Sequence, residues 1–288
     1  MSEVSPASLK TSIIDESIAN TSPAECQILM QLAGNHFSYA LIDITRNKFI
    51  ALCDYRFSLP VQQDELASLF SFEELPIEKN NIKKSIAVHT GKSALVPNAL
   101  YKKEDAGKML ELTSPVSEED QLCADQLKYS DTVHIYAIRK AIIAAIKTMP
   151  GNVNVIHTGT VLIESELLRN KNESEQRMTV NVRQHDMEIV ITARGNLIYY
   201  NSFVFQNSED FIYYLLFVME QLKMNPEKTP LRFTGEIEKT SASYIITSKY
   251  IRNINFGELP DAYEFSYGFR NQSPHTYHSL FNQYLCVS

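Results

Sequence analysis

The chain has 288 residues, of which 44% are hydrophobic and 21% are charged, and its formal net charge is −7. These ordinary globular values exclude a disordered chain, a collagen and a coiled coil. An acidic chain without a basic block is also a poor candidate for non-specific nucleic-acid binding.

The N-terminal residues 1–21 are polar and rich in serine. They lack the apolar core of a signal peptide, and we expect them to form a flexible tail. The longest apolar runs, 141–146 and 213–219, are much shorter than the roughly 20 residues that a membrane-spanning helix needs. The cysteines are far apart and form no CxxC pair: Cys26, Cys53, Cys123 and Cys286. We therefore predict a cytoplasmic protein with free thiols and no transmembrane segment.

The first half of the chain, 22–172, is predicted to alternate strands and helices. Its first four elements are three strands and a helix, at 26–32, 37–44, 48–57 and 62–70. An insertion is predicted at about 78–130, with strand-like pieces and a helix at 103–112. The remaining elements are strand, helix, strand and helix, at 133–138, 139–149, 152–156 and 160–168.

The second half, 173–288, has the clearer periodicity. Met178, Val180 and Val182 alternate with polar residues, as in a strand with one buried face, and Gly195 suits a tight hairpin turn. Ser208 and the acidic residues after it are typical of a helix start. The predicted strands and helices are at 178–183, 187–194, 197–205, 208–222, 231–237, 241–249, 251–256 and 277–285.

Both halves therefore read βββαβαβα once the insertion is removed, which predicts an α/β fold of two tandem units and favours an internal duplication. The resemblance is to the actin-like ATPase superfamily, whose domains are ribonuclease H-like. The chain is most similar to an uncharacterised bacterial family with this fold, related to actin-like proteins of pilus assembly and cell division. The segments that carry this resemblance are 39–45 (YALIDIT), 48–52 (KFIAL), 179–183 (TVNVR), 186–191 (DMEIVI), 196–200 (NLIYY) and 232–236 (RFTGE).

The resemblance implies a nucleotide cleft between the halves, in which two Asp-Gly hairpin turns hold phosphate and metal and a Gly-Gly turn lies near the adenosine. Glycine is needed there because backbone N–H groups must approach phosphate closely. In this chain Asp43 and Thr45 stand at the first turn, Asn181 and Arg183 at the second, and Gly235 alone at the third. These five residues are the candidate ligand-binding residues of the cleft.

The missing glycines favour a protein that has kept the fold and lost ATP hydrolysis. Our first hypothesis is therefore an interaction or regulatory module without catalytic residues, cofactor or metal, which binds a protein partner or a second copy of itself. The alternative is a divergent kinase or ATPase that binds ATP and magnesium, with Asp43 as the metal-site acid and Arg183 at the phosphates.

Three histidine motifs have both a functional and a structural interpretation. His157-Thr-Gly-Thr follows a strand, as a site loop does, but a strand-to-helix turn with Thr158 or Thr160 as the helix cap explains it as well. His89-Thr-Gly-Lys is interpreted as a hairpin corner in the insertion. His275 and His278 have a metal-compatible i, i+3 spacing, but no nearby Cys or carboxylate completes a metal site.

Overall fold

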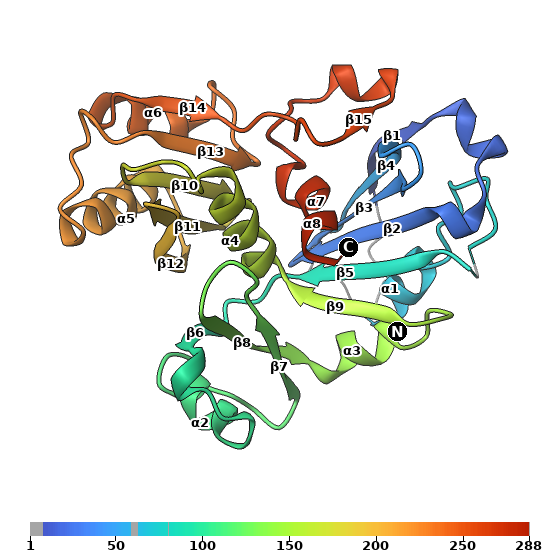
Figure 1. Cartoon of the computed structure of the whole chain (residues 1–288), viewed down its shortest axis with the longest axis horizontal. Helices are drawn as coiled ribbons and strands as arrows, with labels where there is room; N and C mark the ends of the chain where they lie inside the picture. Colours follow the sequence, from blue (N-terminus) through green and yellow to red (C-terminus); the bar gives the residue numbers. More distant parts are fainter. Residues whose placement is uncertain (1–7, 59–62, 80, 288) are drawn as a thin grey trace.

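A computed structural model describes residues 8–58, 63–79 and 81–287. Two β-sheets lie on either side of the central helices α4 (Thr158–Arg169) and α7 (His278–Asn282), as Figure 1 shows. The predicted α/β fold class is confirmed. All four cysteines are free thiols. None of the described helices is long and apolar enough to cross a membrane.

The first lobe is a seven-stranded sheet of order β1-β4-β3-β2-β5-β9, with β15 also paired to β4. Helices α1 (Gln63–Leu69) and α3 (Lys140–Ile146) pack together on its outer side. Its strands are β1 (Ser8–Ile14), β2 (Cys26–Ala33), β3 (His36–Asp43), β4 (Lys48–Arg56), β5 (Lys83–Val88), β9 (Val153–His157) and β15 (Glu264–Phe265).

The second lobe is a five-stranded sheet of order β12-β11-β10-β13-β14. Helices α5 (Ser208–Gln221) and α6 (Ala242–Tyr250) cover the face that carries its apolar core. Its strands are β10 (Arg177–Val182), β11 (Asp186–Ala193), β12 (Asn196–Val204), β13 (Leu231–Gly235) and β14 (Ile254–Phe256).

The two sheets share one strand order and one set of pairing senses. In each, the first three strands of the unit (β2–β4 and β10–β12) form an antiparallel meander. Two further strands then add in parallel on the other side of the first strand. The parallel strand ends of each sheet therefore lie at the edge where its first hairpin turns, and this edge is where the lobes meet. An internal duplication stays a prediction.

The insertion has other boundaries than the sequence predicts. The fourth strand of the first sheet is β5, which the prediction had counted inside the insertion at about 78–130. Residues 133–138 belong instead to a separate sheet of order β6-β8-β7. The insertion comprises β6 (Ser93–Pro97), the short 3-10 turns at Asn98–Leu100 and Lys103–Asp105, α2 (Ala106–Glu111), β7 (Asp120–Gln126) and β8 (Thr132–Arg139).

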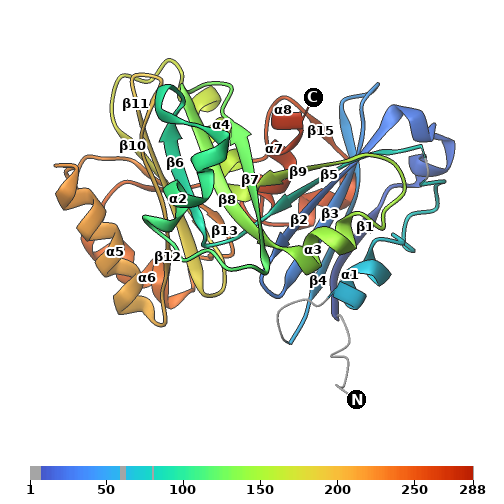
Figure 2. The ribbon, with the colours of Figure 1, turned by 90° about the horizontal axis from the view of Figure 1, so that it is seen from below.

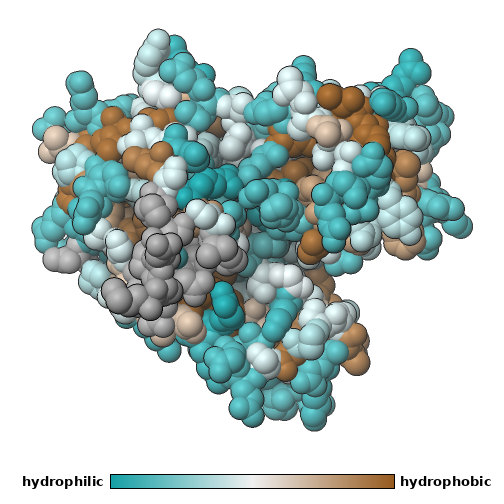
Figure 3. Space-filling view, turned by 180° about the vertical axis from the view of Figure 1, so that it is seen from behind, coloured by the Kyte–Doolittle hydropathy of each residue, from teal (hydrophilic) through white to brown (hydrophobic). Residues whose placement is uncertain are grey.

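Strand β8 was mistaken for a central strand because both of its faces are buried. Val133 and Ile135 pack with Leu110 of α2, whereas Tyr136 and Ile138 join the apolar core of the first lobe. The insertion lies across the boundary between the lobes, since its Leu127 packs with the buried Leu162 of α4 and Val190 of β11. Figure 2 shows the insertion in front of both lobes, and Figure 3 shows its largely hydrophilic outer surface.

Both ends of the chain also differ from the predicted boundaries. The predicted flexible tail is contradicted from residue 8 on, because β1 pairs antiparallel with β4 and Ile18 of the following 3-10 turn (Glu16–Asn20) is buried. A second 3-10 turn, Pro23–Glu25, leads into β2. Residues 1–7 lie outside the described part. Strand β1 was missed because a polar, half-exposed edge strand has the composition of a tail.

The C-terminal segment crosses back to the first lobe, so the predicted second half 173–288 is too long. After β14 come β15, a 3-10 turn (Tyr267–Asn271), α7 and α8 (Tyr284–Val287). Phe281 of α7 is 2% exposed and packs against Phe49 of β4, with ring centroids 4.8 Å apart. Apolar packing on the inner face of the first sheet therefore holds this segment.

We predict that Phe281→Ala lowers the free energy of unfolding by about 3–5 kcal/mol, because it leaves a cavity in this packing. The measurement is urea unfolding of the full chain followed by circular dichroism. Leu112→Ala is the matched control, since Leu112 is 85% exposed and its truncation should change stability by less than about 0.5 kcal/mol. A loss below about 1 kcal/mol for Phe281→Ala would show that the segment is not integral to the first lobe.

Candidate functional site

The candidate site lies where the first hairpin turns of the two lobes face each other. The β2–β3 turn contains Gly34 and Asn35, and the β10–β11 turn contains Arg183 and Gln184. The amide nitrogen of Asn35 lies 3.4 Å from the side-chain oxygen of Gln184, so the two turns are in contact. Both turns line a cavity of about 380 Å³, which we call the inter-lobe cavity.

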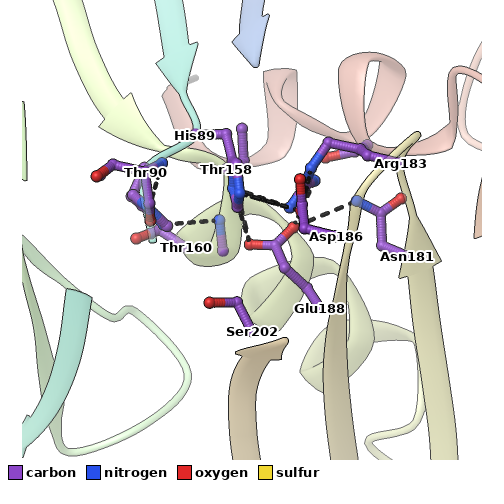
Figure 4. A network of polar contacts seen from close by, with 12 residues as sticks. His89, Thr90, Thr158, Thr160, Asn181, Arg183, Asp186, Glu188 and Ser202 are labelled. Carbon is purple, nitrogen blue, oxygen red and sulfur yellow. Dashed lines mark hydrogen bonds and ion pairs between the residues drawn. The ribbon is translucent and has the colours of Figure 1, made fainter. Parts of the chain in front are cut away.

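Four charged or titratable side chains meet beside this cavity, and we call them the inter-lobe ion cluster: His89, Arg183, Asp186 and Glu188. Arg183 donates from Nε to Asp186 and from Nη1 to Glu188, each at 2.8 Å. The His89 ring, which follows β5 of the first lobe, lies 2.8 Å from Arg183 Nη2 and 3.1 Å from the Asp186 carboxylate. Figure 4 shows these side chains converging from both lobes.

Glu188 is the most enclosed member of the cluster, with an exposed fraction of 0%. Its carboxylate accepts hydrogen bonds from the Tyr200 hydroxyl at 2.8 Å, the Asn181 amide at 3.3 Å and the Thr158 hydroxyl at 3.4 Å. A buried carboxylate needs these hydrogen bonds, because an unpaired charge in the interior is costly. The arrangement therefore holds Glu188 ionised beside Arg183.

The pKa values of the two carboxyl groups reflect this pairing. Burial alone would raise the pKa of Asp186, but the Arg183 guanidinium and His89 lower it to about 2. Burial opposes the charge of Glu188 in the same way, and Arg183 and His89 nevertheless hold its pKa well below the ordinary value. Both groups are therefore ionised at neutral pH, and together they neutralise the guanidinium between them.

A second group of ion pairs joins the lobes on the other side of the cavity. Glu236, just after β13 of the second lobe, accepts from Arg56 at 2.9 Å and lies 3.3 Å from His36. His36 also pairs with the buried Asp54 at 2.6 Å. Burial raises the pKa of Glu236, but His36 and Arg56 lower it below its ordinary value. Both arginines that line the cavity, Arg56 and Arg183, are thus paired with carboxylates.

The first turn of α4 connects the cluster to the insertion. The motif does cap the helix, but the cap is His157, which accepts the Gly159 N–H at 2.9 Å, and not Thr158 or Thr160 as predicted. Thr158 lies 3.1 Å from the His89 ring, and Thr160 donates to Asp125 of β7 at 2.7 Å. The same motif therefore serves as a cap and as part of the site, so the two interpretations are not exclusive.

The predicted cleft residues of the second lobe do lie together. Asn181 and Arg183 both bind Glu188, and Gly235 lies next to Asn181. Gly235 has φ +81°, and a Cβ there would overlap the carbonyl oxygen of Val182. The glycine is required because the backbone of β10 lies against it. The space that a Cβ would fill is therefore occupied by Val182 and Asn181 and is not open to a ligand.

Asp43 and Thr45 do not belong to this site, which corrects their placement in the cleft. They lie at the opposite end of β3 from His36, which at about 3.4 Å per residue is roughly 24 Å away. Asp43 is buried and pairs with Arg46 at 2.7 Å, while Thr45 is exposed in the turn. The error came from assigning the functional turn to the second strand of the meander, whereas the β2–β3 turn is the one that faces the second lobe.

Five residues of the site were not predicted from the sequence: His36, Arg56, His89, Asp186 and Glu188. His89-Thr-Gly is not an insertion corner, because it directly follows β5, a strand of the main sheet. A signal was available: His-Thr-Gly occurs twice, at 89–91 and 157–159, after strands that pair in parallel. His275 and His278 serve backbone carbonyls instead, those of Ile237 and Glu258. Within the described residues, no group of three or more metal-binding side chains is placed to hold an ion.

We predict that Glu188→Gln lowers the free energy of unfolding at pH 7 by about 3–5 kcal/mol, because it leaves the buried Arg183 with one carboxylate fewer. The pKa of Glu188 is depressed in the folded state, so its contribution is present above about pH 5 and is lost as the pH falls. The variant should therefore show a shallower loss of stability between about pH 6 and pH 3. Urea unfolding across this range measures both effects.

The matched control is Glu227→Gln, which removes a carboxylate from an exposed pair with Arg252. Its effect should stay within about 0.5 kcal/mol, as for other surface pairs. Equal stability of Glu188→Gln and the wild-type chain would contradict the structural role of the cluster.

Comparison with known proteins gives relatives of the fold. A Bacteroides thetaiotaomicron protein with an actin-like ATPase fold and unknown function is 20% identical, with a TM-score of 0.73 over 90% of this chain and 96% of that one. A chain of the PilM–PilN type IV pilus biogenesis complex is 12% identical, with a TM-score of 0.58 over 90% of this chain and 97% of that one. No curated protein sequence matches the chain.

These structural similarities establish an actin-like ATPase fold, as the resemblance in the sequence implied. The sequence profile of one family, described as a protein of unknown function (DUF3822), matches residues 15–254. This range covers all strands of the two sheets except β1, β15 and most of β14, and it contains the whole inter-lobe ion cluster. The chain therefore belongs to the DUF3822 family.

Proposed function

We propose that the protein is a cytoplasmic, non-hydrolysing actin-like module that binds a protein partner. The observation that carries this proposal is the inter-lobe ion cluster, in which carboxylates of the chain already neutralise the Arg183 guanidinium. A triphosphate at the facing turns would meet the ionised Asp186 and Glu236 rather than free cations. The negative charges of these two carboxylates would repel the triphosphate, and this repulsion disfavours its binding.

A groove between the insertion and the first lobe supports the partner-binding part of the proposal. Its volume is about 390 Å³, and its apolar lining includes Leu32, Val88 and Ile142. Lys92 and Asp120, which pair at 2.6 Å, lie at the same groove. Apolar side chains with a few polar groups are typical of binding grooves. The PilM structure of the same fold was determined in a complex with PilN, and we propose that a segment of a partner protein occupies the groove here.

The alternative function, a divergent ATP-binding kinase or ATPase, is favoured by one observation. The inter-lobe cavity measures about 380 Å³, within the range of small-molecule sites, and Gly34 in its β2–β3 turn has φ +57° with open space around its backbone. The alternative would have to use Arg56 and the Gly34 turn, because Asp43 lies at the other end of the sheet.

We predict that Ile142→Asp abolishes partner binding, because it places a charge on the apolar wall of the groove. The measurement compares proteins that co-purify with the tagged full chain from native cells, for this variant and the wild-type chain. Ala141→Asp is the matched control, since Ala141 is the exposed neighbour on the same helix.

The proposal requires a partner that is retained by Ala141→Asp and lost with Ile142→Asp. Identical retention by both variants would contradict the groove as the docking site. Dimerisation of the purified chain that only Ile142→Asp abolishes would identify a second copy of the chain as the occupant.

A further inference from the structure

A second cavity, of about 480 Å³, lies at the far end of α4 from the inter-lobe ion cluster. It is bounded by the last residues of α4, the starts of β10 and β13, the end of β14 and the loop before α7. Helix α4 has 12 residues and is therefore roughly 18 Å long. The two cavities share no lining residue, so this one requires its own explanation.

Three arginines converge on this cavity: Arg169, Arg177 and Arg232. Arg232 binds the buried Glu166 of α4, and its Nη2 donates to the Thr179 hydroxyl at 3.2 Å. The Nε atoms of Arg232 and Arg177 are buried, and neither has a hydrogen-bond partner among the residues that the structure describes. Buried donors without partners are rare in folded proteins, and an ion or ligand is one explanation for them.

The charged residues that line the cavity are three arginines and one carboxylate, Glu258. Glu166 is the buried carboxylate that serves this cluster, while Glu173 forms a half-exposed pair with Arg177 that a ligand can displace at little cost. Glu258 lies at the rim with an exposed side chain. Burial lowers the pKa of Arg232, Glu166 opposes this, and Arg169 and Arg177 lower it further. The mutual repulsion of these cations would be relieved by an anion.

The opposite wall of the cavity is apolar. Phe256, Pro230 and Pro274 line it, and the His275 ring lies against Phe256 with centroids 4.6 Å apart. The His275 Nε2 is already engaged by the Ile237 carbonyl at 2.7 Å. The cavity thus combines guanidinium groups, which suit phosphate geometry, with a flat apolar surface.

We propose that this cavity binds a phosphate ester. Its phosphate lies between the guanidinium groups of Arg177 and Arg232, and its organic part lies against Phe256 and Pro230. Arg169 adds positive charge at the entrance. The site is independent of the proposed function, because neither the ion cluster nor the partner groove contributes to it.

The test is a calorimetric titration of the full chain with phenyl phosphate and, separately, inorganic phosphate at constant ionic strength. We expect phenyl phosphate to bind with a Kd below about 1 mM and more tightly than inorganic phosphate, because only the ester contacts the apolar wall. Arg177→Met should weaken binding about tenfold or more, as expected for a lost charged hydrogen bond. Arg232→Met should do so as well if it folds.

Arg252→Met is the matched control, since Arg252 is exposed and lies outside the cavity; it should leave the Kd unchanged. Arg177 is half-buried at the rim, so its variant keeps the test informative even where loss of Arg232 unfolds the chain. No saturable binding of phenyl phosphate up to about 10 mM, or an equal Kd for Arg177→Met and the wild-type chain, would overturn the proposal.

Discussion

The burial of one guanidinium group constrains most of the inter-lobe boundary. Arg183 extends from the first hairpin of the second lobe and is only 8% exposed, so its guanidinium group needs anionic or polar partners. Asp186 and Glu188 provide two of these partners from the adjoining strand, and His89 provides the third from the first lobe. The position of β5 relative to β10 is therefore coupled to the charge state of this cluster.

The inner faces of the two sheets differ accordingly. The first sheet presents apolar residues such as Leu29, Ile42 and Phe49 to α7 and the C-terminal segment. The second presents buried polar residues to α4, including Thr179, Asn181 and Glu188. A helix between such faces needs polar groups on one side, and α4 supplies Thr158 and Glu166 there. The polar inner face of the second lobe thus generates both the ion cluster at one end of α4 and the arginine cavity at the other.

The sequence predicted the elements whose apolar pattern has a single interpretation. The alternation of Met178, Val180 and Val182 located β10. The insertion was misplaced because β8 is buried on both faces, as a central strand is. The sequence could not predict the cluster, because Arg183 and His89 are 94 residues apart and only the fold brings them together. The packing of the C-terminal segment on the first lobe could not be predicted, because its aromatic residues would fit the core of either lobe.

The central claim is that carboxylates of the chain itself supply the negative charge at the lobe boundary that the phosphates of a nucleotide would otherwise bring. Its most direct test is a calorimetric titration with ATP, with and without magnesium, in an Arg177→Met background that weakens phosphate binding at the second cavity. The account predicts no magnesium-dependent heat at about 1 mM ATP, the range of weak ligands, and no phosphate release. Magnesium-dependent binding that a further Arg56→Met substitution abolishes would contradict it.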